Sequence, residues 1–272
     1  MLKLINKEGR KMKEIIEANK QAWNEAVEYH KRARKNSLHE QFKDTSFTTF
    51  NNSEADKNLI EKIKGLNLKG KKVAHLQTNN GRELISLMRV CEAKEGIGFD
   101  ISDQAIAEAN ELKDIAKANA KFECVNIFEI DKKYNNYFDM VYITEGSLSW
   151  LPSVEEYFSV VSRITKRGGS LLISEIHPIG FVLDKQNEKP VNYQDKGPYK
   201  LLSGLDYVGE VDYQPKDCFW YMHKTSDIIM GLIKNGFEIK EFEESNEDTG
   251  WVDPKNENPN FPRSFVLIAT KR

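Results

Sequence analysis

Polar side chains follow four short apolar segments of the chain, and their chemistry suits the binding of a nucleoside. The first segment leads into Thr78-Asn79-Asn80-Gly81, and the second ends at Asp100, which follows Gly81 by 19 residues. An ionised carboxylate only accepts hydrogen bonds, so Asp100 could accept from both hydroxyls of a ribose. The alternative role is a helix N-cap, but Ser102 could cap the next helix instead.

The third and fourth segments end in residues that extend this set. Asn126 follows the third segment, and an amide can both donate to and accept from an adenine edge. Thr144-Glu145-Gly146 follows the fourth segment. Gly81 is the one glycine left of the three that a dinucleotide-binding loop expects. The loop therefore suits a nucleoside with a zwitterionic tail better than a dinucleotide, whose charge needs several bare amides.

Histidine and cysteine chemistry gives one further candidate. His177 follows a fifth apolar segment and should lie at the same edge of the sheet. Its ordinary pKa lies near neutrality, so it could act as a general base or hydrogen-bond a group behind the site. Cys91, Cys124 and Cys218 show no CxxC pairing, and the histidines lack metal-ligand spacing. We therefore expect no metal site and a reducing, cytoplasmic location.

Short apolar runs that alternate with helical patterns predict an α/β fold with a parallel, doubly wound sheet. The predicted strands are Val73–Gln77, Gly96–Asp100, Phe122–Val125, Phe138–Ile143, Ser170–Glu175, Phe237–Glu243 and Ser264–Thr270. The predicted helices are Glu54–Lys64, Arg82–Cys91, Asp103–Asn119, Ser153–Lys166, which should close at Gly168-Gly169, and Ser226–Lys234. Strands that are apolar nearly throughout must be covered on both faces. Ligands should then bind outside the carboxyl ends of the strands.

The N-terminal part of the chain lies outside this alternation. Residues 11–35 predict one amphipathic helix, with Trp23 and His30 two turns apart on its apolar stripe. A polar linker should follow through Ser53, so that residues 1–53 form a helical lid and linker. His30 is either a buried histidine on an apolar helix face or, with Trp23, a contact to cofactor or substrate.

Residues 178–222 also break the alternation, and they are rich in aromatic side chains. They contain five tyrosines, among them Tyr193 and Tyr207, and also Trp220. We expect a β-rich insertion whose aromatics either only pack or form a cover over the substrate. Trp150 precedes this insertion and is expected to pack in the core or to form a wall of the pocket.

Taken in order, these segments resemble the class I S-adenosylmethionine-dependent methyltransferases. His75-Leu76-Gln77 is similar to the branch in which His-Leu-Gln replaces Asp-Leu-Gly, and Gly96-Ile97-Gly98-Phe99-Asp100 matches the second motif. Phe138-Asp139-Met140-Val141 and Lys166-Arg167-Gly168-Gly169 match two further signatures. The similarity runs from about Lys71 to Pro178 and resumes near the C-terminus.

The resemblance implies a Rossmann-like seven-stranded sheet, mostly parallel, with an antiparallel last strand. It implies S-adenosylmethionine as the cofactor and S-adenosylhomocysteine as the product. It also implies which residues contact the cofactor: Gln77, Thr78 and Gly81 for its methionine part, Asp100 for the ribose, Ile101, Asn126 and Ile127 for the adenine, and Glu145 and Gly146 for the sulfonium.

Charge and hydropathy narrow the function. Lys and Arg number 40 and Asp and Glu 42, for a net charge of −2, so no basic face is expected for nucleic acid or an anionic membrane. No run of about 18 apolar residues is present to span a membrane. We expect residues 54–272 to transfer a methyl group to a small-molecule acceptor by in-line displacement.

Two alternatives stay open because the first motif departs from the family pattern. His75 stands where the family usually has an acidic residue, and Gln77 and Asn79 replace two glycines. A non-catalytic protein that binds S-adenosylmethionine or a related nucleoside is the main alternative. A nicotinamide oxidoreductase is the other, and the missing glycines argue against it.

Overall fold

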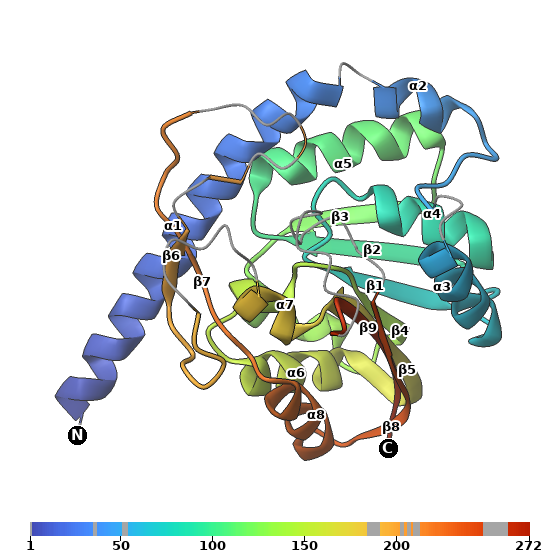
Figure 1. Cartoon of the computed structure of the whole chain (residues 1–272). Coiled ribbons are helices and arrows are strands. Elements are labelled where there is room, and N and C mark those ends of the chain that lie inside the picture. The colour runs from blue at the N-terminus through green and yellow to red at the C-terminus, as the bar shows by residue number, and fades with distance from the viewer. Residues whose placement is uncertain are drawn as a thin grey trace.

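The chain forms a central sheet with helices on both faces (Figure 1). The computed structural model describes residues 2–34, 37–50, 54–183, 191–201, 204–205, 208, 213–246 and 261–272. The sheet has seven described strands in the order β3 (Ala120–Cys124), β2 (Glu95–Asp100), β1 (Lys72–Leu76), β4 (Phe138–Ile143), β5 (Thr165–Ile176), β9 (Ser264–Lys271) and β8 (Phe237–Ser245). Strands β1 to β5 pair in parallel, and β9 runs antiparallel to both of its neighbours. The predicted Rossmann-like sheet with an antiparallel last strand is confirmed.

Two apolar cores lie on opposite faces of this sheet. Side chains alternate along each strand, so Val141 and Ile143 of β4 enter one core while Met140 and Tyr142 enter the other. The first core is closed by α6 (Val154–Ile164) and α8 (Thr225–Lys234), and the second by α3 (Glu54–Gly65), α4 (Arg82–Cys91) and α5 (Asp103–Ala116). Because both faces are covered, the central strands β1 and β4 are apolar at most positions, which is why the sequence predicted them well. The edge strands β3 and β8 carry charged side chains as well.

The N-terminal region differs from its prediction. Helix α1 spans Leu2–Arg34, and the segment predicted as linker contains a further helix, α2 (Ser37–Lys43). The linker prediction was therefore wrong in this part. Leu38 and Phe42, one turn apart, are buried in the core on the α5 side. Two apolar positions are too few to show a helical period, so packing rather than pattern determines this helix. None of the helices within the described ranges is long and apolar enough to cross a membrane.

The end of α6 is a second correction. The helix ends at Ile164, and β5 already begins at Thr165, so Gly168-Gly169 lie within a strand. The pairing of β4 with β5 shifts register between Phe138 and Met140, opposite this segment. A Cβ on Gly169 would lie 2.9 Å from the Lys166 carbonyl oxygen. The glycine thus serves an irregular, closely packed strand rather than a helix end.

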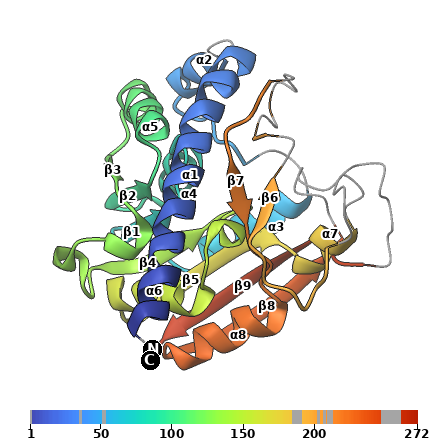
Figure 2. The same cartoon turned by 90° about the vertical axis from the view of Figure 1, so that its left-hand side faces the viewer.

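The described part of the 178–222 insertion consists of short elements. Helix α7 (Pro178–Leu183) follows β5, and β6 (Tyr199–Leu201) pairs antiparallel with β7 (Cys218–Trp220). Tyr207 lies outside the described residues. Figure 2 shows the β6–β7 ribbon beside α1, on the side of the molecule where the strands β1 to β5 end. Segments about 200 residues apart in the sequence, Asn19 and Phe219, are hydrogen-bonded there.

We expect any side chain at Gly98 to destabilise the protein, because β2 packs closely on β3 at this position. A Cβ at this position would lie 2.5 Å from Phe122 Cδ1 and 2.8 Å from Thr78 Cγ2. Gly98→Ala should lower the free energy of unfolding by about 1–3 kcal/mol, as overpacked cores do. The measurement is the denaturation midpoint in urea. Gly65→Ala is the matched control, because no atom lies within 4 Å of its Cβ position. Equal midpoints for both variants would contradict this packing argument.

Candidate active site

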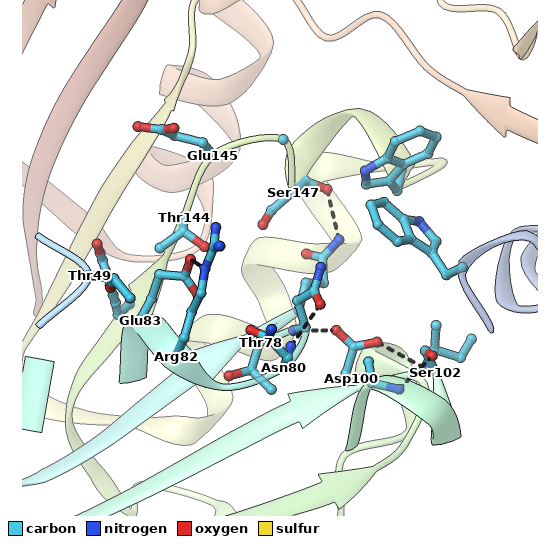
Figure 3. Close-up of a pocket in the computed structure, with 18 of the residues that line it drawn as sticks. Thr49, Thr78, Asn80, Arg82, Glu83, Asp100, Ser102, Thr144, Glu145 and Ser147 are labelled. Atoms are coloured by element: carbon cyan, nitrogen blue, oxygen red, sulfur yellow. Dashed lines mark hydrogen bonds and ion pairs between the residues drawn. The ribbon is translucent and has the colours of Figure 1, made fainter. Parts of the chain in front are cut away.

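A cavity of about 880 Å³ opens at the carboxyl ends of β1, β2, β3 and β4 (Figure 3). Small-molecule pockets typically measure roughly 300–1,000 Å³, so this one is large enough for a nucleoside and part of a second molecule. Ten residues singled out from the sequence line it: Trp23, Gln77, Thr78, Asp100, Ile101, Asn126, Ile127, Glu145, Gly146 and Trp150.

Two side-chain bridges join β1 to β4, the pair at which the strand order reverses. His75 lies between the hydroxyl oxygens of Thr144, 3.0 Å from Nε2, and Thr78, 2.9 Å from Nδ1. Gln77 Nε2 donates to the Ser147 carbonyl oxygen at 2.8 Å. Burial lowers the pKa of His75 to about 4, so at neutral pH its ring is uncharged and can donate through one nitrogen and accept through the other. The crevice where ligands bind in such sheets is therefore held at a fixed width.

The turn after β1 takes its shape from left-handed backbone at three positions. Gln77, Asn79 and Gly81 have φ of 54°, 49° and 74°. Asn79 thus adopts the conformation for which glycine is usual, as asparagine tolerates. Gly81 does not line the cavity: a Cβ there would lie 2.4 Å from Phe122 Cζ. Gly81 allows the turn to sit closely on β3, while Gln77, Thr78 and Asn79 face the cavity.

Asp100 is fixed by the backbone on both sides. Its carboxylate accepts from the N–H of Asn79 at 2.8 Å and of Ser102 at 2.9 Å. Ser102, not Asp100, caps α5, because its hydroxyl oxygen accepts from the N–H of Ala105 at 3.1 Å. Burial raises the pKa of Asp100 and the backbone donors oppose that rise. A carboxylate has about four acceptor sites, so Asp100 retains capacity toward the cavity.

The loop after β4 is held by a carboxylate that the sequence did not reveal. Glu175, at the end of β5, accepts from the N–H groups of Gly146, Ser147 and Leu148, the last two at 2.9 Å. Its own neighbour Ile176 donates to it as well, at 2.7 Å. Burial raises the pKa of Glu175 to about 7, and these four donors act in the opposite direction. Glu175 thus fixes the loop that forms one wall of the cavity.

Glu145 lines the cavity beside other charged side chains. Burial raises its pKa to about 8, and the carboxylates of Glu175, Glu83 and Asp56 act in the same direction. Arg82 opposes them, and its Nε donates to Glu83 Oε1 at 2.5 Å. In Figure 3, Glu145, Arg82 and Glu83 lie on one side of the cavity, and Asp100 and Ser102 on the other. The cavity therefore has two separate ends, one with Glu145, Arg82 and Glu83 and the other with Asp100.

An aromatic pair forms the wall nearest to α1. The rings of Trp23 and Trp150 meet edge to face, with centroids 5.5 Å apart. Helix α1 is tied to the insertion by Asn19, which donates to the carbonyl oxygen of Phe219 at 2.8 Å and accepts from its N–H at 2.7 Å. The Asn19 side chain thus pairs with both the N–H and the C=O group of Phe219 in β7, as a neighbouring strand would.

The sequence did not single out several lining residues. They include Thr49, Asp56, Arg82, Glu83 and Ser147. Arg82 and Glu83 directly follow the predicted turn and begin α4, and that position could have identified them. Thr49 and Asp56 come from before the sheet, and no local pattern distinguishes them.

His177 lies outside the cavity lining. Its Nε2 is 2.9 Å from Glu244 and 3.3 Å from the Thr225 hydroxyl oxygen, and its Nδ1 accepts from the N–H of Ile179 at 3.2 Å. It is buried. These contacts join β5, β8 and α8 and indicate a packing role, so the geometry does not support a general base at this position.

Three residues for which the sequence left ligand contact and packing open also lie away from the cavity lining. His30 is buried, and its Nε2 lies 2.9 Å from the Leu205 carbonyl oxygen. Trp220 stacks on Tyr199 at 4.7 Å, and the Tyr193 hydroxyl accepts from the N–H of Thr225 at 3.0 Å. All three hold the framework around the cavity.

Comparison with known proteins agrees with this geometry. A family model described as "Methyltransferase domain" matches residues 67–236, well over half of the chain. The chain belongs to this family. The resemblance predicted from the sequence is thereby confirmed. No curated protein matches the sequence.

Solved structures share the fold of this methyltransferase domain at low identity. A candidate S-adenosylmethionine-dependent methyltransferase from Listeria monocytogenes is 20% identical, with a TM-score of 0.60 over 78% of this chain and 96% of that one. One from Clostridium acetobutylicum is 17% identical, with a TM-score of 0.57 over 89% and 96%. The geranyl diphosphate C-methyltransferase of Streptomyces coelicolor, solved with S-adenosylhomocysteine, is 11% identical, with a TM-score of 0.53 over 80% and 79%.

The family and the fold support S-adenosylmethionine as the cofactor, and the cavity fits it. Gln77 Oε1 is buried and, within the described part of the chain, has no hydrogen-bond partner, so it can accept from a bound ammonium group. Asp100 presents a carboxylate for hydroxyl groups, and Ile101 and Ile127 give an apolar surface beside it. No part of this donor set conflicts with an adenosyl group and a zwitterionic tail.

We expect Glu145 to make the stability of the methyltransferase domain fall as pH rises. Its folded pKa of about 8 exceeds the ordinary value of 4.5, so the folded state holds the proton longer than the unfolded state does. The contribution of Glu145 to the free energy of unfolding is therefore at its maximum below about pH 4.5, and it is lost as the pH rises through about 8. Glu145→Gln cannot ionise, so at about pH 8.5 it should exceed the wild type by roughly 1–3 kcal/mol and match it near pH 5.

Urea unfolding at both pH values measures this difference. Glu155→Gln is the control, because Glu155 is exposed on α6 and pairs with Lys234 at 2.8 Å. Its stability should run parallel to that of the wild type. Parallel curves for Glu145→Gln and the wild type would show that Glu145 is not destabilised by its surroundings.

Proposed function

We propose that this methyltransferase domain transfers a methyl group from S-adenosylmethionine to a small-molecule acceptor by in-line displacement. The observation that carries the proposal is the cavity at the β1–β4 switch point. There Gln77 Oε1 has no partner within the part of the chain that the structure describes, and Asp100 is held by two backbone donors. The family assignment supports the reaction class.

The proposal gives each wall of the cavity a part of the cofactor. Asp100 holds the ribose hydroxyls, and Ile101, Asn126 and Ile127 border the adenine. Gln77 and Thr78 contact the methionine part, and Gly81 shapes the turn beneath them. Glu145 and Gly146 lie nearest to the sulfonium. The fixed positions of Asp100, Gln77 and the Gly146 loop support these roles.

The cofactor, when bound, supplies an activated methyl group and a good leaving group at sulfur. The residues of this chain then need chiefly to orient two molecules and exclude water. Glu175 holds the loop after β4, and Gln77 joins that loop to the turn after β1. Both sides of the reaction site are thus fixed before any ligand binds, which reduces the entropy that binding must remove.

We further propose that residues 1–53 and the 178–222 insertion cover the acceptor, over a methyltransferase domain of residues 54–272. Trp23 and Trp150 would form the wall against the acceptor, while His30, Tyr193 and Trp220 hold the cover in place. The paired hydrogen bonds between Asn19 and Phe219 support this organisation. A covered site suits a small acceptor, as does the net charge of −2. The similar Streptomyces enzyme is named for a small acceptor, geranyl diphosphate. We propose a cytoplasmic location from the cysteine pattern.

We expect Asp100→Ala to bind S-adenosylmethionine and S-adenosylhomocysteine at least tenfold more weakly, about 1.4 kcal/mol, because two ribose hydroxyls lose a charged acceptor. Isothermal titration calorimetry measures both affinities. Thermal unfolding shows whether the variant is folded, since Asp100 also accepts from two backbone N–H groups. Asp100→Asn keeps one acceptor oxygen and should lose less. Unchanged affinity in a folded Asp100→Ala variant would refute the ribose assignment.

The proposed function itself is tested with the wild-type protein. Calorimetry with S-adenosylmethionine, S-adenosylhomocysteine and NAD should show binding of the first two only. Methyl-labelled S-adenosylmethionine and a broad set of small acceptors should then give labelled product. Tight NAD binding without binding of the other two would overturn the proposal, and cofactor binding without transfer to any acceptor would argue for a non-catalytic role.

A further inference from the structure

Glu145 is a cavity carboxyl that has no hydrogen-bonding partner among the described residues. No hydrogen bond or ion pair joins Glu145 to any residue in the described ranges, although it lines the cavity and is mostly buried. Its acidic neighbours differ in this respect. Glu83 accepts from Arg82, and Glu175 accepts from four backbone N–H groups. Glu145 is thus the carboxyl of this group that is left to interact with a ligand.

The surroundings of Glu145 disfavour its ionised form. The carboxylates of Glu175 on β5, Glu83 on α4 and Asp56 on α3 raise its pKa, and the Arg82 cation on α4 opposes them. A carboxyl in such a place costs stability, since burial and like charges both oppose ionisation. Arg82 offsets part of that cost at a distance, but no hydrogen bond or ion pair to a described residue does. Ionisable groups with strongly shifted pKa values in cavities are often catalytic.

The position of Glu145 is fixed although its carboxyl is not engaged. It follows Thr144, which is bridged to β1 through His75, and precedes Gly146, whose N–H donates to Glu175. Ser147, two residues on, accepts from Gln77 across the switch point. A group that takes a proton during a reaction must be held in place in this way, with its own acceptor atoms unoccupied.

We propose that Glu145 is the general base that accepts the proton of the acceptor's nucleophile, and that the acceptor therefore bears a proton on its nucleophilic atom, as a hydroxyl, a thiol or a primary or secondary amine does. This inference rests on the proposed function and goes beyond it by assigning the base and the acceptor class. A thioether or a tertiary amine has no proton to give and would not need Glu145.

The step balances in atoms and charge. Glu145 removes the proton from the O–H, S–H or N–H group as the nucleophilic atom forms its bond to the methyl carbon. The bond from the methyl carbon to sulfur breaks, and its electron pair stays on sulfur. One positive charge on sulfur and one negative charge on Glu145 disappear together. The neighbours of Glu145 disfavour its ionised form, so the carboxylate takes up a proton readily. Removal of the acceptor's proton is easier for that reason.

Sinefungin tests this placement without a known acceptor. It is an analogue of S-adenosylhomocysteine that carries a primary amine where the transferred methyl group would be. If Glu145 faces the nucleophile, its carboxylate should bind that amine. Glu145→Gln should then weaken sinefungin binding by about tenfold or more and change S-adenosylhomocysteine binding by less than about threefold. Glu145→Asp should retain part of the preference, and Glu155→Gln should retain all of it.

A measurement on the wild type alone keeps the test valid if a Glu145 variant fails to fold. The affinity for sinefungin relative to S-adenosylhomocysteine should rise between about pH 6 and about pH 8, as Glu145 ionises. A flat ratio would overturn the inference. Equal losses of both ligands in Glu145→Gln would also overturn it, because Glu145 would then contact the shared methionine part, and so would no loss of either ligand. If the wild type bound neither ligand, the proposed function itself would fail.

Discussion

The pairing of β1 with β4 is the constraint on which the rest of the site depends. At this pair the strand order reverses, so the loops that follow the two strands diverge to opposite sides and leave a crevice. Two side chains fix the width of that crevice: His75 bridges two threonine hydroxyls, and Gln77 reaches the Ser147 carbonyl oxygen. The replacement of the usual acidic residue by His75 therefore adds a neutral bridge rather than leaving a gap. Gln77 and Asn79, which stand where the family usually has glycine, adopt the left-handed backbone conformation that glycine would have there.

A second property of the site is its concentration of buried ionisable groups. Burial lowers the pKa of His75 and raises those of Asp100, Glu145 and Glu175. Asp100 and Glu175 are compensated by backbone N–H donors, and these donors also shape the loops that carry them. Glu145 has no such compensation among the described residues. Burial of a carboxylate thus serves to shape a loop at Asp100 and Glu175. In our proposal it serves the reaction at Glu145.

The proposed cover over the cavity depends on contacts between parts of the chain that are far apart in sequence. Asn19 of α1 satisfies both backbone groups of Phe219, and His30 lies against Leu205. These contacts support a framework role for His30 and Trp220, for which the sequence left packing and ligand contact as alternatives. An aromatic residue or a histidine in the sequence shows that a side chain can contact a ligand. Only the packing of α1 and the insertion decides whether it does.

The sequence alone determined the sheet and the main cavity wall. Strands covered on both faces are apolar at nearly every position, and residues at their carboxyl ends must meet at one edge, so the order of the segments already places Asp100, Gln77, Asn126 and Glu145 together. Tertiary structure decided the rest. Helix α2 has too few apolar residues to show a period, and Gly168-Gly169 marks a strand irregularity rather than a helix end. Glu175 and the separation of His177 from the cavity were equally hidden, because their partners come from distant segments. Local sequence patterns show which positions of a helix or strand are buried. Contacts between segments far apart in the sequence depend on how these elements pack.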